Sequence, residues 1–295
     1  MVVGVDVGGT KIAGAVVARD SSLRATATLP TPVAGVDLVA AVGDLVTRLR
    51  TEVGEELEAV GVGVPSLIDR RSGLVRMSAN VDLADLDVRG VLQKRLGVVI
   101  GLDNDANLAA LAEHRVGAGR DYGDIVMLTI GTGVGGGVIA GDNVFRGGSG
   151  TGAELGHMVV LADGPPCQRN CPNRGCLETM CSGTAIARDA GVPAEEVVKR
   201  ARAGDASAIT VLDRAGRYLG VGLSNLANIF NPDAFVIGGG VAAAGDLLLG
   251  PAIDEYRQRA LPPNAEAHVV VAALGPRAGA IGAGLFAWGL VDRDG

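Results

Sequence analysis

The chain reads Gly4-Val5-Asp6-Val7-Gly8-Gly9-Thr10-Lys11 near its start. This stretch joins the apolar runs Val2–Val7 and Ile12–Val17 through a Gly-Gly turn, and it predicts a β-hairpin. A second stretch of the same kind, Thr129-Ile130-Gly131-Thr132-Gly133-Val134-Gly135-Gly136-Gly137, includes the end of the predicted strand Ile125–Ile130. The two stretches lie about 120 residues apart, which is near the length of one domain. We therefore expect a duplicated α/β domain whose two hairpins face one another across a cleft.

Strand and helix patterns alternate along the rest of the chain. The expected helices are Val36–Glu55, 106–116, 209–230 and Gly279–Gly289, and the expected strands are Ala59–Val64, Val98–Leu102, Phe235–Ile237 and His268–Ala273. Such alternation is typical of the α/β class. The break between the halves is expected near Gly117. One lobe would then hold residues 1–117 with a C-terminal helix at about 282–295, and the other would hold residues 118–281.

Composition excludes several classes of function. Of 295 residues, 46 are glycine, and they are clustered rather than periodic, which indicates backbone that approaches a ligand closely. The net charge is −7 and aromatic residues make up 3%, which argues against nucleic acid or an anionic membrane surface as a partner. No apolar run reaches the ~20 residues of a membrane span, and the start lacks the basic region of a signal peptide. We therefore expect a cytoplasmic protein whose four cysteines are reduced.

The glycine loops suggest a nucleotide. Gly131-x-Gly133-x-x-Gly136 matches a dinucleotide fingerprint, but a return strand follows it where that fingerprint needs a helix. The turn Gly8-Gly9-Thr10-Lys11 offers N–H groups, a hydroxyl and a cation, which suits a polyphosphate. The turn Gly131-Thr132-Gly133 offers similar groups. Ordinary tight turns are the alternative for each loop.

Two features near these loops fit the same hypothesis. Asp6 lies two residues before the glycines, within reach of a Mg²⁺ that bridges the phosphates. Gly238-Gly239-Gly240 leads from a predicted strand into a predicted helix. A helix N-terminus offers free N–H donors to a phosphate or a ribose.

Asp105 stands where a predicted strand ends and the helix 106–116 begins. One interpretation is an N-cap, a role for which Asn104 and Asn107 compete. The other is a general base, because the carboxyl end of a parallel strand faces the ligand crevice and a carboxylate there accepts a hydroxyl proton during phosphoryl transfer. Position alone does not decide between them.

Metal-ligand residues gather in one short stretch: His157, Cys167, Cys171 and Cys176. One histidine and three cysteines form a standard closed set for structural zinc. Three buried thiols and a surface histidine are the alternative. Glu154 and Glu178 flank the set, so zinc would hold two carboxylates beside one pocket, which suits the hydroxyl groups of a sugar.

Five motifs occur in order and together resemble the ROK family (repressors, open reading frames and sugar kinases), and within it the bacterial ATP-dependent glucokinases. They are Asp6-Val7-Gly8-Gly9-Thr10-Lys11, Asn104-Asp105-Ala106-Asn107, Gly131-Thr132-Gly133-Val134-Gly135-Gly136-Gly137, Glu154-Leu155-Gly156-His157 and Cys176-Leu177-Glu178. The resemblance runs from residue 4 to about residue 285. Five ordered motifs are far more specific than any one of them.

The resemblance implies an actin-like ATPase (ribonuclease H-like) fold, with two lobes of mixed sheets flanked by helices and a central cleft. It implies transfer of a phosphoryl group from ATP to the 6-hydroxyl of glucose, with Asp105 as the base. The sugar ligands it implies are Asn80, Asn104, Asp105, Glu154, His157 and Glu178. The Mg-ATP ligands it implies are Asp6, Gly8, Gly9, Thr10, Lys11, Gly131, Thr132, Gly133, Gly239 and Gly240. It also implies structural Zn²⁺ on the His/Cys set and a homodimer or homotetramer.

The sequence departs from the family pattern in three places. Three residues separate Cys167 from Cys171, where the family commonly has one. The usual Ala-Gly-Glu reads Gly152-Ala153-Glu154, and the segment 81–86 after Asn80 lacks the aromatic residue often found there.

Other functions compete with glucokinase. A kinase for mannose, fructose or an N-acetylhexosamine needs the same machinery, and polyphosphate is an alternative donor. A sugar-responsive repressor carries an extra N-terminal helix-turn-helix, for which no room is expected before Gly4. Asp105 weighs against a non-catalytic sugar sensor.

Overall fold

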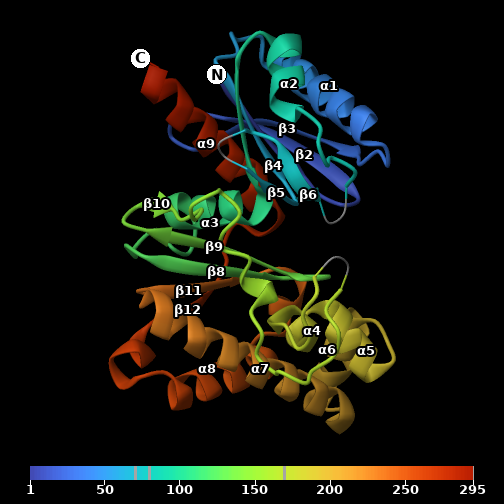
Figure 1. The fold of residues 1–295 in the computed structure, drawn as a ribbon, viewed down its shortest axis with the longest axis vertical. Coiled ribbons are helices and arrows are strands. Elements are labelled where there is room, and N and C mark those ends of the chain that lie inside the picture. Colours follow the sequence, from blue (N-terminus) through green and yellow to red (C-terminus); the bar gives the residue numbers. More distant parts are fainter. Residues whose placement is uncertain (70–71, 79–80, 169–170, 295) are drawn as a thin grey trace. The chain divides into compact units, whose positions relative to one another are not determined.

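The computed structural model describes residues 1–69, 72–78, 81–168 and 171–294 (Figure 1). The chain forms two compact units. The first unit comprises Met1–Gly117, Val144–Ala153 and Pro276–Gly295, and the second comprises Ala118–Asn143 and Glu154–Gly275. The division into lobes that the sequence predicts, with a break near Gly117, remains a prediction.

The first unit is built on a mixed five-stranded sheet of order β3-β2-β1-β4-β7. Its strands are β1 (Val2–Val7), β2 (Lys11–Val17), β3 (Leu23–Pro30), β4 (Ala59–Val64) and β7 (Val99–Asn104). Strand β1 pairs antiparallel with β2 and parallel with β4. The unit also holds helices α1 (Gly35–Val53), α2 (Val88–Leu96), α3 (Asp105–Val116) and α9 (Ala278–Asp294), with a small ribbon of β5 (Ser66–Ile68) and β6 (Val75–Ser78).

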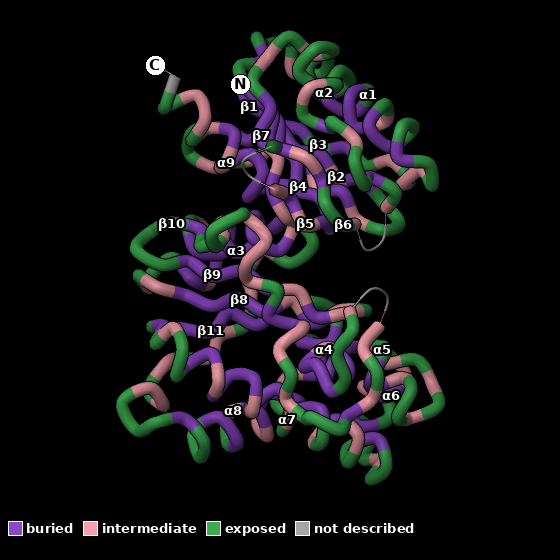
Figure 2. The backbone as a smooth tube through the Cα atoms, viewed as in Figure 1, coloured by how far each residue is buried: buried purple, intermediate pink, exposed green. Residues whose placement is uncertain are grey.

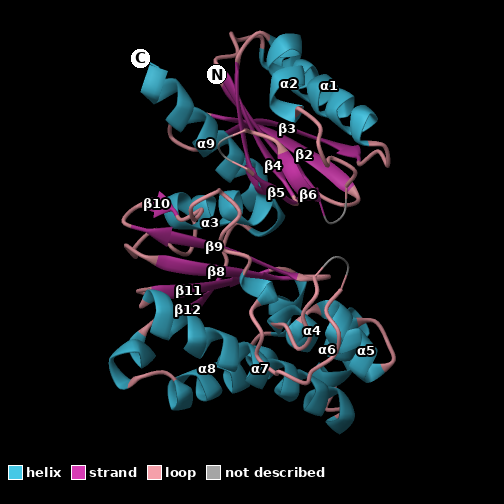
Figure 3. Cartoon of the chain, in the orientation of Figure 1, coloured by secondary structure: helices cyan, strands magenta, loops and turns pink. Residues whose placement is uncertain are grey.

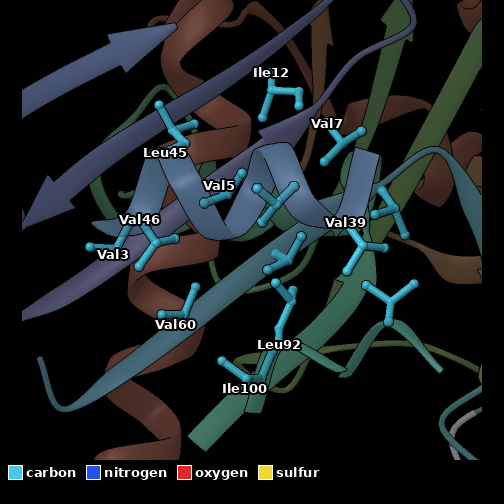
Figure 4. Packing of buried hydrophobic residues seen from close by; sticks show 14 of the residues in the cluster. Val3, Val5, Val7, Ile12, Val39, Leu45, Val46, Val60, Leu92 and Ile100 are labelled. Carbon is cyan, nitrogen blue, oxygen red and sulfur yellow. The ribbon is translucent and has the colours of Figure 1, made fainter. Parts of the chain in front are cut away.

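Strand β1 is buried on both faces because alternate side chains pack against different helices. Val3, Val5 and Val7 pack in one cluster with side chains of α1 and α2, such as Val39 and Leu92 (Figure 4). On the opposite face, Val2, Ala15 and Ala59 pack with Ala280 and Ala287 of α9. The continuous apolar run of β1 therefore follows from a sheet covered on both sides.

Helix α9 approaches the sheet closely because glycine faces it. A Cβ atom on Gly4 would lie 2.0 Å from the carbonyl oxygen of Ala280, and one on Gly61 would lie 1.9 Å from that of Ala283. Contacts this short are impossible for a side chain. Both glycines are thus required for the packing of α9 on β1 and β4.

The second unit repeats the hairpin-plus-parallel-strand arrangement. Its sheet has the order β10-β9-β8-β11-β12, with β8 (Ile125–Ile130), β9 (Val134–Ala140), β10 (Asn143–Val144), β11 (Ala234–Gly238) and β12 (His268–Val271). Strand β8 pairs antiparallel with β9 and parallel with β11. The expected duplication of a strand–turn–strand unit is therefore present in both sheets.

The helices of the second unit are α4 (Leu177–Cys181), α5 (Gly183–Ala190), α6 (Ala194–Arg202), α7 (Ala206–Phe230) and α8 (Asp246–Arg259). Short 3₁₀ helices of this unit occur at η1 (Leu155–His157), η2 (Gly240–Ala244) and η3 (Pro262–Glu266), and η4 (Gly275–Arg277) begins at its last residue and continues into the first unit. Figure 3 shows these helices and the magenta strands of the sheet. Helix α8 packs on β11 through an edge-to-face contact of Tyr256 with Phe235, whose ring centroids lie 5.5 Å apart. Both residues are fully buried, and the tube of β11 is purple in Figure 2.

Several expected elements differ from the observed ones. Strand β7 continues to Asn104, so Asp105 opens α3 directly. Gly239 and Gly240 lead into the 3₁₀ helix η2, and the α-helix expected there begins only at Asp246. No helix in the part of the chain that the structure describes is both long and apolar enough to cross a membrane.

Candidate functional site

The turn between β1 and β2 is shaped by its own backbone and by one threonine. Gly8 N donates to Lys11 O over 2.9 Å, and Thr31 donates through Oγ1 to Gly8 O over 2.7 Å and through N to Thr10 O over 3.1 Å. Gly9, Thr10 and Lys11 are exposed. The turn therefore presents a fixed backbone with an exposed hydroxyl and ammonium group, as a polyphosphate site requires. Sequence reasoning did not identify Thr31, which lies 23 residues from Gly8.

Asp6 lies at the end of β1, partly buried. Burial and repulsion by Asp105 raise the pKa of Asp6 to about 7, and Lys11 acts in the opposite direction. A cation close to this carboxyl group would stabilise its ionised form, which burial and the charge of Asp105 disfavour. Asp6 is thus suited to a divalent ion bound with phosphate, and it lies in the same unit as the β1–β2 turn.

The structure shows that Asn104, and not Asp105, caps helix α3. Asn104 is the N-cap of α3, since its Oδ1 accepts from Ala106 N over 2.9 Å and from Asn107 N over 3.2 Å. Asp105 is the first helical residue, and its Oδ1 accepts from Ala106 N over 2.9 Å. Burial raises the pKa of Asp105, and the hydrogen bond from Ala106 partly offsets this effect. A raised pKa brings a carboxylate closer to the range of an effective general base.

Two other residues of the first unit, Asn104 and Asn80, are expected to bind the sugar. The Nδ2 group of Asn104 donates to Ser66 O over 3.4 Å, so this side chain joins the α3 cap to β5. Asn80 lies outside the described residues.

The four metal-ligand residues converge in the second unit. Cys167 Sγ lies 3.4 Å from His157 Nδ1, and Cys171 Sγ lies 3.9 Å from Cys176 Sγ. All four ligand atoms lie within 4.8 Å of one another. A tetrahedral Zn²⁺ with Zn–S bonds of about 2.3 Å separates two sulfur atoms by about 3.8 Å, so the set fits zinc. The wider spacing between Cys167 and Cys171 does not prevent this convergence.

The chemistry of the thiols also favours a cation. Burial and the neighbouring Cys167 and Cys171 thiols raise the pKa of Cys176. Crowded thiols resist ionisation unless a positive charge stabilises the thiolates, which a bound metal supplies.

Helix α4 connects the metal-ligand set to the second glycine turn. Cys176 immediately precedes α4, and Glu178 lies in its first turn. The Oε2 atom of Glu178 accepts from Val134 N over 2.9 Å, at the start of β9. Glu178 is thus held between the cysteine that precedes its helix and the β8–β9 hairpin. Glu154, the other expected carboxylate, is exposed and precedes η1, where its carbonyl accepts from His157 N over 3.0 Å.

Two further hydrogen bonds hold the backbone of the β8–β9 turn. Gly183 N donates to Gly131 O over 2.7 Å, and Thr184 Oγ1 donates to Thr132 O over 2.7 Å. Within the turn, Gly131 N donates to Gly133 O over 2.9 Å. The side chain of Thr132 is left exposed. Thr184 was not identified from the sequence, since nothing in its local pattern indicates a partner 52 residues away.

Gly239 requires a residue without a side chain. Its φ angle is +87°, and a Cβ atom there would lie 2.3 Å from Ile130 O. Gly239 and Gly240 are both exposed, at the carboxyl end of β11 and the start of η2. In an α/β sheet this end of a parallel strand is where ligands bind.

The comparisons with known proteins agree on one family. The ROK family model matches residues 2–289. A glucokinase of Thermotoga maritima is 38% identical over 95% of this chain and 95% of its own length. A xylose repressor of Bacillus spizizenii is 31% identical over 77% of this chain and 60% of its own length.

Solved structures of ROK proteins also resemble the whole chain, and two of them are at least 34% identical to it. A ROK hexokinase from Thermus thermophilus is 38% identical with a TM-score of 0.88, and the match covers 100% of this chain and 99% of that one. A ROK glucokinase from Streptomyces griseus, solved in complex with glucose and AMPPNP, is 34% identical with a TM-score of 0.84 at the same coverage.

Proposed function

Because this chain belongs to the ROK family and is a sugar kinase with the actin-like ATPase fold, we propose that it transfers the γ-phosphoryl group of ATP to the 6-hydroxyl of glucose. The observation that carries this proposal is the environment of Asp105. Asn104 supplies the helix cap, so the Asp105 carboxylate is not needed for that role. The glucokinases among the relatives support glucose as the sugar.

Asp105 acts in this proposal as the general base. Its carboxylate orients the 6-hydroxyl and accepts the proton as the oxygen attacks the γ-phosphorus. The hydrogen bond from Ala106 N to Oδ1 fixes one oxygen of the carboxylate. Such a base typically contributes ~10²–10⁴ in rate.

The glycine turns bind the nucleotide in this proposal. Gly8, Gly9, Thr10 and Lys11 of the first unit, and Gly131, Thr132, Gly133, Gly239 and Gly240 of the second, hold the phosphates and the ribose of ATP. Asp6 binds the Mg²⁺ that accompanies the phosphates. Mg²⁺ supplies charge neutralisation on the β- and γ-phosphate oxygens when it is bound.

The sugar contacts are proposed for Asn80, Asn104, Glu154, His157 and Glu178. His157 uses one ring nitrogen for the metal-ligand set and the other for a sugar hydroxyl. Zinc at His157, Cys167, Cys171 and Cys176 has a structural role, because a closed set leaves no position for water. The set supports Glu178 through Cys176, the residue before α4.

A coupled assay tests the proposal. Glucose, ATP and Mg²⁺ are supplied with glucose-6-phosphate dehydrogenase, and NADPH formation is followed for the wild type and Asp105→Asn. We expect turnover in the wild type and a loss of at least ~10²-fold in Asp105→Asn, with glucose binding by calorimetry retained. Full activity in Asp105→Asn would show that another group is the base.

The same assay format separates the alternative functions. ADP release measured with mannose, fructose and N-acetylhexosamines identifies a kinase for another hexose. No release with any sugar, together with DNA binding that a sugar alters, would favour the regulatory function of the xylose repressor relative. A cytoplasmic location and a homodimer or homotetramer belong to the proposal as well.

A further inference from the structure

A buried ion pair lies two residues before the proposed base. Asp103 Oδ2 accepts from Arg146 Nε over 2.6 Å and lies 2.5 Å from Arg146 Nη2. The Asp103 side chain is 7% exposed and that of Arg146 is 15% exposed. A charge-assisted hydrogen bond, with a second guanidinium nitrogen close to the same carboxylate oxygen, forms a strong and directional contact, especially where water is largely excluded.

The second carboxylate oxygen of Asp103 accepts hydrogen bonds from residues on both sides of Asp105. Its Oδ1 accepts from Asn104 N over 2.8 Å and from Asn107 Nδ2 over 3.2 Å. Asn104 is the cap of α3, and Asn107 is a residue of its first turn that is only 2% exposed. One carboxylate therefore joins Arg146 to the chain on both sides of Asp105.

Arg146 is itself held in place. It lies in Val144–Ala153, the segment that belongs to the first unit although the residues before and after it belong to the second. Its Nη1 donates to Val144 O over 3.2 Å, and its carbonyl accepts from Gly152 N over 3.0 Å. The guanidinium carbon lies 5.6 Å from the centroid of the Phe286 ring of α9, within the range of a cation–π contact.

We propose that Arg146 and Asp103 are positioning residues for the sugar kinase reaction, which fix the first turn of α3 and so the carboxylate of Asp105. This inference rests on the proposed role of Asp105 as the base. A displacement of about 1 Å in a reacting group costs on the order of 10²-fold in rate. A lysine at position 146 keeps the charge but has a single nitrogen, so it cannot contact both Asp103 Oδ2 and Val144 O as the planar guanidinium group does.

The test compares Arg146→Lys with Arg95→Lys. Arg95 belongs to the same unit, where its Nη1 donates to Ala40 O over 2.8 Å and its Nη2 pairs with Asp44 over 2.5 Å, so its substitution removes an arginine–aspartate pair between α2 and α1. We expect Arg146→Lys to lower kcat by about 10–100-fold, with the KM for ATP within about twofold of wild type. We expect Arg95→Lys to leave kcat unchanged.

Hydrogen exchange supplies a readout that does not depend on catalysis. The amides of Ala106 and Asn107 are bound to Asn104 Oδ1. Their exchange should accelerate at least about 10-fold in Arg146→Lys and in Asp103→Asn, and remain unchanged in Arg95→Lys.

The outcomes separate this inference from the proposed function. If Asp105→Asn is inactive and Arg146→Lys turns over like the wild type, the positioning role is overturned. A rise in KM at unchanged kcat, or a lower melting temperature alone, overturns it as well. If Asp105→Asn stays active, the assignment of the base fails, whereas unchanged exchange at Ala106 and Asn107 in Arg146→Lys shows that the ion pair does not hold this turn.

Discussion

Burial raises the pKa of the Asp6 carboxyl group in the first unit towards neutral pH. Its pKa is raised from 3.8 to about 7, mainly by burial and next by the charge of Asp105. Between these two pH values the folded chain keeps a proton that the unfolded chain has released. The free energy of unfolding therefore falls as the pH rises through this window, by about 1.4 kcal/mol for each pH unit that separates the two pKa values.

We predict that Asp6→Asn removes much of this pH dependence. Urea unfolding at about pH 4 and about pH 8 should show that the variant gains stability relative to the wild type at the higher pH. Asp20→Asn is the control, because Asp20 is exposed and its hydrogen bonds with Ser22 lower its pKa. Parallel pH profiles for wild type and Asp6→Asn would contradict the assignment.

The residues of the candidate site differ in how far the sequence predicts them. The motifs identify Asp105 and Asn104 as a pair, but only the hydrogen bonds show that Asn104 is the cap. Arg146 is invisible to local patterns, because its partner Asp103 lies 43 residues earlier in the chain. Spacing predicts groups that act within one turn or helix, whereas contacts between distant segments need the fold.

At the scale of elements, α4 and α5 fix the turn between β8 and β9. Three hydrogen bonds join these helices to residues 131–134: Gly183 and Thr184 donate to the carbonyl groups of Gly131 and Thr132, and Glu178 accepts from Val134 N at the start of β9. A turn rich in glycine loses much conformational freedom when it binds a ligand in one shape. Hydrogen bonds that fix the turn beforehand lower this entropic cost.

We predict that Thr184→Val weakens nucleotide binding. The substitution keeps the shape of the side chain but removes the bond to Thr132 O, which is worth about 1 kcal/mol, so the KM for ATP should rise about 3–10-fold. The KM for sugar should change less. Thr210→Val is a matched control, since Thr210 Oγ1 donates over 2.8 Å to Ala206 O on an exposed part of α7. An equal effect of both variants on the KM for ATP would contradict the role of Thr184.

The sequence predicted strands most accurately where both faces of the strand are covered by helices. The continuous apolar runs of β1 and β4 predicted both strands to the residue, Val2–Val7 and Ala59–Val64, because each is covered on both faces. Strand β3 (Leu23–Pro30) was not expected. It lies at the edge of the sheet, and its two buried side chains are the small Ala25 and Ala27, which give a weak alternating pattern.

At the scale of the whole molecule, the duplicated α/β organisation was predictable because one pattern occurs twice, whereas the actin-like fold followed from the resemblance to the ROK family. A hairpin followed by parallel strands builds both sheets, and each hairpin has its own glycine turn. The metal-ligand set occurs in the second unit alone among the described residues. The stability that a metal supplies should therefore act mainly on that unit, since binding free energy of a structural ion is folding free energy.

We predict about one zinc per chain and a loss of stability when it is removed. Elemental analysis of the purified protein gives the stoichiometry, and thermal unfolding with and without a chelator gives the loss. Cys171→Ser should bind less zinc and melt at a lower temperature. Cys181→Ser should keep its zinc, because Cys181 lies outside the set and donates to Leu177 O. Equal zinc content in both variants would contradict the assignment of the set.

The two glycines beneath α9 affect how a complete substitution map of this protein would look. Alanine at Gly4 or Gly61 would place a methyl group on the backbone of α9, at distances where atoms overlap. Such a map would therefore show as little tolerance of substitution at these two glycines as at Asp105, although neither glycine has a chemical role. Only abundance measurements made beside activity would separate the two kinds of intolerance: chains altered at Gly4 or Gly61 should disappear from the cell, whereas chains altered at Asp105 should accumulate and stay inactive.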